Sequence, residues 1–328
     1  MAFLRKISNI GDSTISSLIQ DNLIEHFDWG LMDAGGFVNI SVPTSGLYGG
    51  DKHKLRLVDD PRYTSGQVWE GFRSNWIWQS GFSGPAQPLT TTTPPSPGVS
   101  GVYVDGNFKS ITDTGTYSHY IDYPNGRVVS DSPISTTSEV TAEFSYKWVK
   151  VTRADEDFFR EIQYRSERAD GDFTLVGSGD WSQLADNRLQ LPAVAVEVVK
   201  DRSLSPYALG GGRHIVNTDV LFHVLAEDDF ERDKLIDIIS LQQDAEIAMF
   251  DSDRIGRSGV FPLDYRGMVN ANPKIHTELI KPSGDGGYKY SGVKGGSITI
   301  TDSRVSISDA ISPNLYHGVV RLNAQVIT

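Results

Sequence analysis

The sequence predicts an α+β protein with an inserted β-rich region. An amphipathic helix pattern lies near the start, alternating strand-like runs dominate residues 99–151, and helix and strand patterns alternate after residue 152. With 328 residues, the chain is long enough for one large domain or two modest ones. The hydrophobic fraction of 38%, together with 32 glycines, is typical of a chain that buries an ordinary core.

The first expected element is a helix that begins after Asp12 or Ser13 and ends before Gly30. Both polar residues favour an N-cap. The apolar residues that follow are spaced mostly three or four positions apart, which is typical of one helix face: Ile15, Leu18, Ile19, Leu23, Ile24 and Phe27. The alternating run 37–42 predicts a strand. Four large rings come next, and for them we favour packing between layers over ligand binding: Trp69, Phe72, Trp76 and Trp78.

A proline- and threonine-rich stretch, 85–98, is expected to form a linker or an exposed arm, because proline and β-branched residues disfavour a helix. In the β-rich region beyond it, Asn125-Gly126 separates two alternating runs and predicts a hairpin within residues 117–129. The run 140–151 predicts a single strand with one face toward water. The residues expected on that face are Thr141, Glu143, Ser145 and Lys147.

The rest of the chain is predicted to alternate between helices and strands. Residues 155–164 predict a short helix, and the nearly continuous apolar run 191–199 predicts a strand that is covered on both faces. An alternating strand, 214–226, leads to a helix that Asp228 or Asp229 caps. The apolar face of this helix is expected to contain Phe230, Leu235, Ile238 and Ile239. Further strands are expected at 297–301, 305–307 and 316–327.

These patterns divide the chain into four parts. Residues 1–84 contain the N-terminal helix and strand of the core, and residues 85–98 form the arm. Residues 99–151 form the inserted β-rich region, and residues 152–328 supply the rest of the α+β core with its C-terminal strands.

Composition excludes several classes of protein. The net charge of −12 argues against a protein that grips nucleic acid phosphates, which requires clustered lysine and arginine. The absence of cysteine excludes disulfides, zinc thiolates and a catalytic thiol. No run of about 18 apolar residues could cross a bilayer, and polar residues interrupt the apolar part of any export signal. We therefore expect a soluble protein that is made in the cytosol and does not contact a membrane.

Two short motifs resemble catalytic or metal sites. Gly11-Asp12-Ser13 is similar to the nucleophile box of GDS-type esterases, but Asn314 precedes His317 where that family has aspartate, so we favour helix capping. Residues 251–256 resemble the start of a calcium loop, but proline occupies the twelfth position, where the EF-hand has glutamate.

The remaining candidates are also explained more simply by structure. The glycines 210–212 lack the lysine of a phosphate-binding loop and favour a hairpin loop. The acidic pairs at 155–157 and 228–229 favour helix caps over paired catalytic acids. No two of the seven histidines have the spacing of a helical metal pair, and His223 is expected to be a half-buried side chain. We expect neither an enzyme nor a bound cofactor or metal.

The segment 191–239 resembles the core of the lambda-type tail-terminator proteins of long-tailed bacteriophages. Its apolar strand reads Pro-Ala-Val-Ala-Val at 192–196, its second strand spans 219–224, and an acidic-capped helix follows from Asp228. The opening helix and the closing strand, 316–327, also fall where that family has them. The resemblance covers roughly a third of the chain, and the residues between 80 and 149 are additional to the small terminators.

This resemblance implies a mixed sheet flanked by helices and a structural role in the virion. A terminator of this family forms a six-fold homo-oligomeric ring at the head-proximal end of the tail tube. The ring stops tube polymerisation and docks the head connector. The implied partners are other copies of the chain, the tail tube, sheath proteins and the connector, while DNA passes without specific binding. Such a protein is assembled in the host cytoplasm and resides in the virion neck.

Two alternatives from other classes remain open. A β-rich tail or adhesin module could bind host surface glycans. Its aromatic platform would contain Tyr103, Tyr117, Tyr120, Tyr123, Trp69, Trp76 and Trp78. A hydrolase would use Ser13 as its nucleophile.

Overall fold

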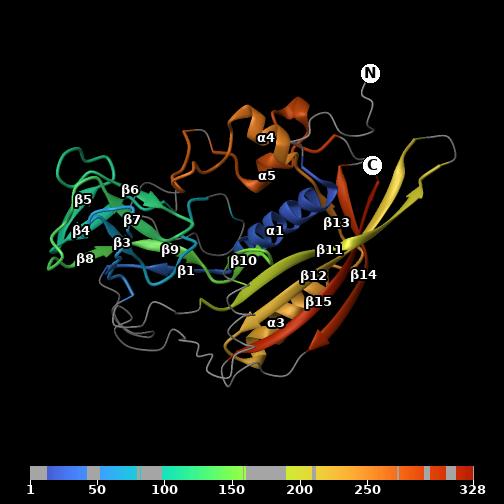
Figure 1. Cartoon of the computed structure of the whole chain (residues 1–328), viewed down its shortest axis with the longest axis horizontal. Coiled ribbons are helices and arrows are strands. Elements are labelled where there is room, and N and C mark those ends of the chain that lie inside the picture. Colours follow the sequence, from blue (N-terminus) through green and yellow to red (C-terminus); the bar gives the residue numbers. More distant parts are fainter. Residues whose placement is uncertain are drawn as a thin grey trace.

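The computed structural model describes residues 13–42, 52–79, 82, 98–157, 159, 190–208, 212–271, 273–291, 296–307 and 315–327. A six-stranded mixed sheet with two helices on one face adjoins a region of shorter sheets (Figure 1). This architecture confirms the α+β class and its β-rich region.

Helix α1 (Ile15–Asp33) is longer than the sequence pattern predicted. Its N-cap is Thr14, so the predicted cap at Asp12 or Ser13 is wrong. The helix also continues through Gly30, where an interior glycine costs about 1 kcal/mol relative to alanine. Burial of two further large side chains on the last turn offsets that cost: Trp29 and Met32.

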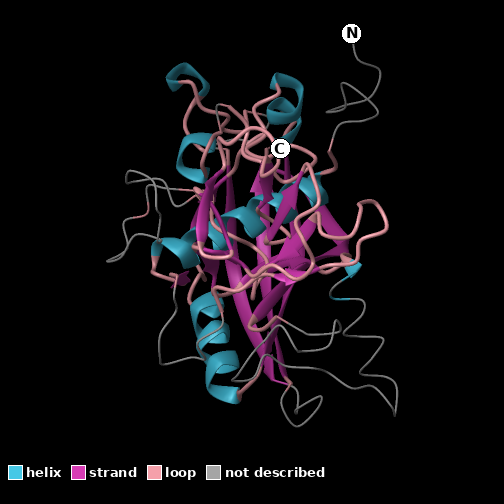
Figure 2. Cartoon of the chain, turned by 90° about the vertical axis from the view of Figure 1, so that its left-hand side faces the viewer, coloured by secondary structure: helices cyan, strands magenta, loops and turns pink. Residues whose placement is uncertain are grey.

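The main sheet has the spatial order β10-β11-β12-β15-β14-β13. The bounds are β10 (Lys150–Arg153), β11 (Ala193–Pro206), β12 (His214–Ala226), β15 (Tyr316–Ile327), β14 (Ser297–Ile307) and β13 (Glu246–Ala248). Only β10 and β11 run parallel, and the other neighbours are antiparallel. The strands predicted at 297–301 and 305–307 are one strand with a register shift between Ile300 and Asp302. In Figure 2 the long strands run together through the molecule.

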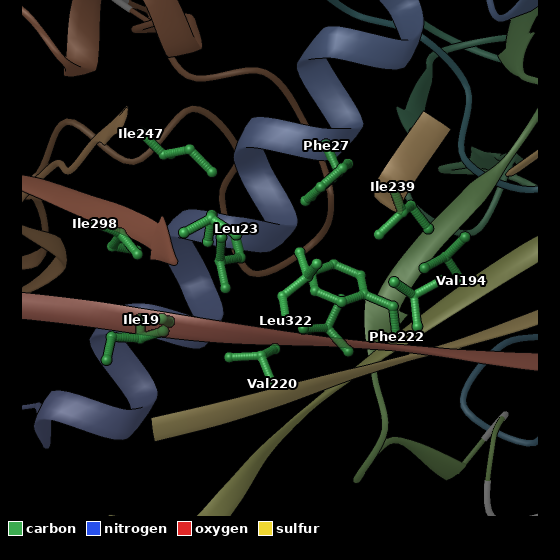
Figure 3. Close-up of a cluster of buried hydrophobic side chains, with 14 of the residues drawn as sticks. Ile19, Leu23, Phe27, Val194, Val220, Phe222, Ile239, Ile247, Ile298 and Leu322 are labelled. Atoms are coloured by element: carbon green, nitrogen blue, oxygen red, sulfur yellow. The ribbon is translucent and has the colours of Figure 1, made fainter. Parts of the chain in front are cut away.

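Helices α1 and α3 (Asp229–Ser240) cover one face of this sheet. Figure 3 shows Leu23 and Phe27 of α1 pointing toward Phe222 and Leu322 of the sheet, and the rings of Phe27 and Phe222 meet edge to face at 4.9 Å. Each buried side chain of this kind contributes about 1.5–3 kcal/mol. Asp228 caps α3 as predicted. The alternation in 214–226 and 316–327 therefore sorts residues correctly onto the two faces of the sheet.

The expected position of Phe230 on the buried face of α3 is wrong. Its side chain is 75% exposed, whereas Leu235 and Ile239 of the same helix are buried. With 3.6 residues per turn, Phe230 lies about 140° around α3 from Leu235 and about 180° from Ile239, so it is on the opposite side of the helix.

The β-rich region combines strands from both sides of the predicted arm. The four-stranded sheet has the order β2 (Arg56–Leu57), β3 (Val68–Glu70), β7 (Arg127–Ser130) and β6 (His119–Asp122). The three-stranded sheet has the order β5 (Asn107–Ser110), β4 (Gly101–Val104) and β8 (Val140–Ala142). A two-stranded sheet pairs β1 (Phe37–Ile40) with β9 (Phe144–Lys147). The predicted hairpin is confirmed as β6 and β7. Its Gly126 has φ 63°, and a Cβ there would lie 2.4 Å from the carbonyl oxygen of Arg73.

The single half-exposed strand predicted for 140–151 is wrong. This run forms β8, β9 and the start of β10, and its polar residues Thr141 and Ser145 are buried. On the face expected to be polar, Ser145 Oγ donates to Asn39 Oδ1 of the neighbouring strand β1 at 2.9 Å. On the other face, Trp76 stacks on Phe144 with centroids 4.3 Å apart. Packing is likewise confirmed for the predicted aromatic cluster, in which Trp69, Phe72 and Trp76 are buried.

Candidate functional site

The long strands β11, β12, β15 and β14 have a polar face on the side opposite α1 and α3. Polar side chains from neighbouring strands bond to one another across this face. Asp219 of β12 forms an ion pair with Arg321 of β15 and accepts a hydrogen bond from Asn323 Nδ2 at 3.1 Å. The hydrogen bond from Arg321 lowers the pKa of Asp219.

The same pattern continues toward the ends of the strands. Gln325 Nε2 donates to Asn217 Oδ1 at 3.0 Å, and Thr301 Oγ1 donates to Asn323 Oδ1 at 2.7 Å. Arg304 of β14 pairs with Asp302 at 3.0 Å. Charges and amides on this face are therefore satisfied by one another, which leaves little excess charge to hold a ligand.

Two histidines and a glutamate occupy the other end of the polar face. His223 Nε2 lies 3.1 Å from Glu197 Oε2, and His223 Nδ1 lies 3.4 Å from His317 Nε2. Both contacts are satisfied when His223 donates to Glu197 and accepts from His317. Burial and the neighbouring His223 lower the pKa of His317 to about 4. The predicted half-buried His223 is thus the centre of a hydrogen-bonded chain across three strands.

One edge of the main sheet is open along β11. Strand β10 pairs only with residues 193–196 of β11, and the rest of β11 pairs on that side with no strand in the described part of the chain. The β11–β12 hairpin extends past α1 at the right of Figure 1. Leu204 on this edge is 58% exposed.

The opposite edge is open along β14. Strand β13 pairs only with residues 297–299, so residues 301–307 have β15 as their single strand neighbour among the described residues. Val305 and Ile307 are 47% and 56% exposed. Register places both residues, and Leu204 on the other edge, on the face of the sheet that carries α1 and α3, because their partners include the buried Val320 and Val216.

Exposed apolar side chains on open strand edges are unusual, because such edges readily pair with another chain. Beyond β10 and β13, no strand in the described part of the chain pairs with the outer backbone N–H and C=O groups of β11 and β14, so these edges can extend the sheet. The two edges are different surfaces on opposite sides of one sheet, so they can contact each other only between different copies.

The structure gives the catalytic candidates ordinary structural roles. Ser13 donates from its backbone N and from Oγ to the carboxylate of Asp253, at 2.9 and 2.7 Å, and contacts no histidine among the described residues. Asp251 caps helix α4 (Ser252–Ser258) by accepting from Arg254 N at 2.9 Å. Residues 251–256 therefore begin a helix and do not form a calcium loop.

Other predicted features lie largely outside the described residues. These are Gly11 and Asp12, the arm 85–98 except Gly98, the helix at 155–164 beyond its first residues, and Gly210 and Gly211.

No helix among the described residues is long and apolar enough to span a bilayer. No protein-family profile and no curated protein sequence matches the chain.

Proposed function

We propose that the chain is a structural subunit of the virion of a tailed phage, acting in the neck as a tail-terminator ring. The proposal is supported by the resemblance of residues 191–239 to tail terminators and by the two open edges of the main sheet. The ring caps the tail tube and joins it to the head connector, and no chemical reaction is involved.

The pair of open edges is the observation that carries this proposal. The edge of β14 in one copy can pair with the edge of β11 in the next, which leaves the same two edges free at the ends of the new assembly. Head-to-tail contacts of this kind close into rings when the rotation between copies permits. Leu204 of one copy and Val305 of the next then lie on the same face and bury apolar surface together.

The polar face is suited to line a channel for DNA. The helices occupy the other face of the sheet, so the part of the polar face around Asp219 is available to a lumen, whereas its His223 end packs against Phe159. Its arginines are paired with acids of the same chain, Arg321 with Asp219 and Arg304 with Asp302. A duplex passing through meets few free cations, and so forms few salt-dependent phosphate contacts that would retain it.

Light scattering on the purified chain across a concentration series, followed by negative-stain imaging, tests the proposal. A closed ring near six copies is the expected result. The double variant Val305→Lys/Ile307→Lys places charges on the β14 edge and is expected to abolish rings without unfolding the subunit. Leu241→Lys is the matched control, because Leu241 is 78% exposed at the end of α3. Rings that persist in the double variant, or a stable trimer of the unmodified chain, would contradict the proposal.

An aromatic surface favours glycan binding as a second candidate function. Tyr120 bonds to Tyr63 through their hydroxyl groups at 3.0 Å, and Arg266 lies over both Tyr120 and the 95% exposed Tyr265. Three members of the platform expected from the sequence are buried in the core: Trp69, Trp76 and Tyr123. Thermal stabilisation by a sugar, lost in Tyr265→Ala, would support this function, and no shift across a sugar panel would exclude it.

A further inference from the structure

A cleft of about 850 Å³ lies beside α1 and β10, and neither the open part of β11 nor that of β14 lines it. Its walls come from α1, β10, α4 and the segment that contains α5 (His276–Leu279), and Figure 1 shows α4 and α5 above α1. Asn22 holds the wall in place, because its side chain accepts from Phe250 N at 2.7 Å and donates to Phe250 O at 3.1 Å. The volume is typical of a small-molecule site. The apolar part of the lining includes Ile24, Val151, Phe250, Ile255, Phe261 and Leu279.

Three carboxyl groups of α1 face this cleft at positions i, i+4 and i+7. Asp21 forms an ion pair with Arg153, and Asp28 Oδ2 lies 2.6 Å from Lys147 Nζ. Glu25 lies between them and has no hydrogen bond or ion pair within the described part of the chain. The row therefore contains three acids and two cations, so that one negative charge is uncompensated when all of them are ionised.

Two further groups in the cleft lack a partner. Gln79 Oε1 and His276 Nδ1 are buried without a hydrogen bond among the described residues, and both side chains line the cleft and are 5% exposed. Buried polar atoms are paired in the great majority of native proteins. The amide oxygen of Gln79 can only accept, so it requires a donor. This oxygen has almost no solvent-exposed surface, so a donor in the cleft would reach it only after the Gln79 side chain turned toward the cleft.

The cationic side chains of the cleft are already engaged. Besides Arg153 and Lys147, Lys274 Nζ lies 3.3 Å from Glu278 Oε1, and Arg257 Nε donates to the carbonyl oxygen of Asp253 at 3.2 Å. The cleft thus combines the Glu25 carboxyl, which has no hydrogen bond or ion pair within the described part of the chain, with an apolar floor. This combination disfavours phosphate or carboxylate ligands and favours a cation.

We propose that this cleft binds a cation on an aliphatic stem, an alkylammonium or alkylguanidinium group, whose charge pairs with Glu25. The stem packs on Ile24 and Phe250. The same chemistry occurs in a free small amine and in a lysine or arginine side chain of a partner protein. This site is independent of ring assembly, since neither open strand edge contributes to it.

Calorimetric titration of the full chain at pH 8 with n-butylammonium and with n-butylguanidinium tests the proposal. Saturable binding at one site is expected, and n-butanol and butyrate, which share the stem, are expected to bind at least about tenfold more weakly. Glu25→Gln keeps the shape of the side chain and is expected to lower the affinity for butylammonium at least about tenfold. Asp237→Asn, an exposed acid on α3, is the matched control and should bind as the unmodified chain does.

Equal binding of butylammonium and butanol, or full affinity in Glu25→Gln, would overturn the proposal. So would an affinity that stays constant between pH 8 and pH 6, because protons compete with the cation for Glu25. N-acetyl-lysine N-methylamide distinguishes the two sources. Binding at least as tight as that of butylammonium assigns the site to a partner's side chain, and binding of the free amine alone assigns it to a small molecule.

Discussion

Replacing Glu25 by glutamine is expected to stabilise the folded protein above pH 7. Burial, and then the charge of Asp28, raise the pKa of Glu25 from 4.5 to about 7. The folded state therefore holds this proton more tightly than the unfolded chain, so the contribution of Glu25 to stability falls as the pH rises from about 4.5 to 7. Each tenfold change in proton affinity corresponds to about 1.4 kcal/mol. Because water reaches part of the side chain, we expect a gain of about 2–3 kcal/mol for Glu25→Gln at pH 8.

Urea unfolding followed by tryptophan fluorescence at several pH values measures this gain. The curves of unfolding free energy against pH for the variant and the unmodified chain should separate above pH 6 and converge near pH 4.5. Asp237→Asn should follow the unmodified chain within about 0.5 kcal/mol. A Glu25→Gln protein that is less stable at pH 8, or a difference that does not change with pH, would refute the assignment of an unpaired buried carboxyl.

Three further predictions concern the buried histidines, the cap of α3 and the binding of DNA. Burial lowers the pKa of both His276 and His317 to about 4. The unfolded chain takes up these protons first, so the contribution of the two histidines to stability should fall as the pH drops from 6.5 toward 4, opposite to the contribution of Glu25. In His276→Gln and in His317→Gln, the thermal midpoint should decrease less steeply than in the unmodified chain as the pH drops from 6.5 to 4. An equally steep decrease in both variants would contradict the lowered pKa values. Asp228→Ala removes the acceptor for Glu231 N at 2.7 Å and should cost about 1 kcal/mol in urea unfolding. Random duplex DNA should bind no more tightly than about 10⁻⁴ M at physiological salt by fluorescence anisotropy; tighter binding would contradict an inert channel.

Local patterns in the sequence predict the long strands and the cap of α3. Alternation separates Leu322 from Arg321 and Asn323 because a strand places successive side chains on opposite faces. Thr141 and Ser145 are exceptions to the same rule. They are polar and alternate like solvent-facing residues, but both are buried, and Asn39 of the neighbouring strand β1 supplies a hydrogen bond to Ser145. Whether a polar face meets water is decided by distant parts of the chain.

The open edges and the cleft could not be predicted from local patterns. Parts of β11 and β14 lie at open edges because their outer neighbours, β10 and β13, are too short to pair with them along their whole length. The spacing of Asp21, Glu25 and Asp28 is visible in the sequence. Their partners, however, lie 132 and 119 residues away at Arg153 and Lys147, so the unpaired state of Glu25 emerges only in the folded chain.

The salt dependence of assembly distinguishes backbone pairing from ion pairing between copies. Each copy carries a net charge of −12, so copies repel one another at low ionic strength. If strand edges and apolar side chains such as Leu204 and Val305 hold the copies together, added salt screens the repulsion and should favour rings. Contacts made by ion pairs between copies would instead weaken with salt. Light scattering between low salt and about 1 M salt, where screening is nearly complete, separates the two cases, and rings that dissociate as salt rises would refute pairing through the sheet edges.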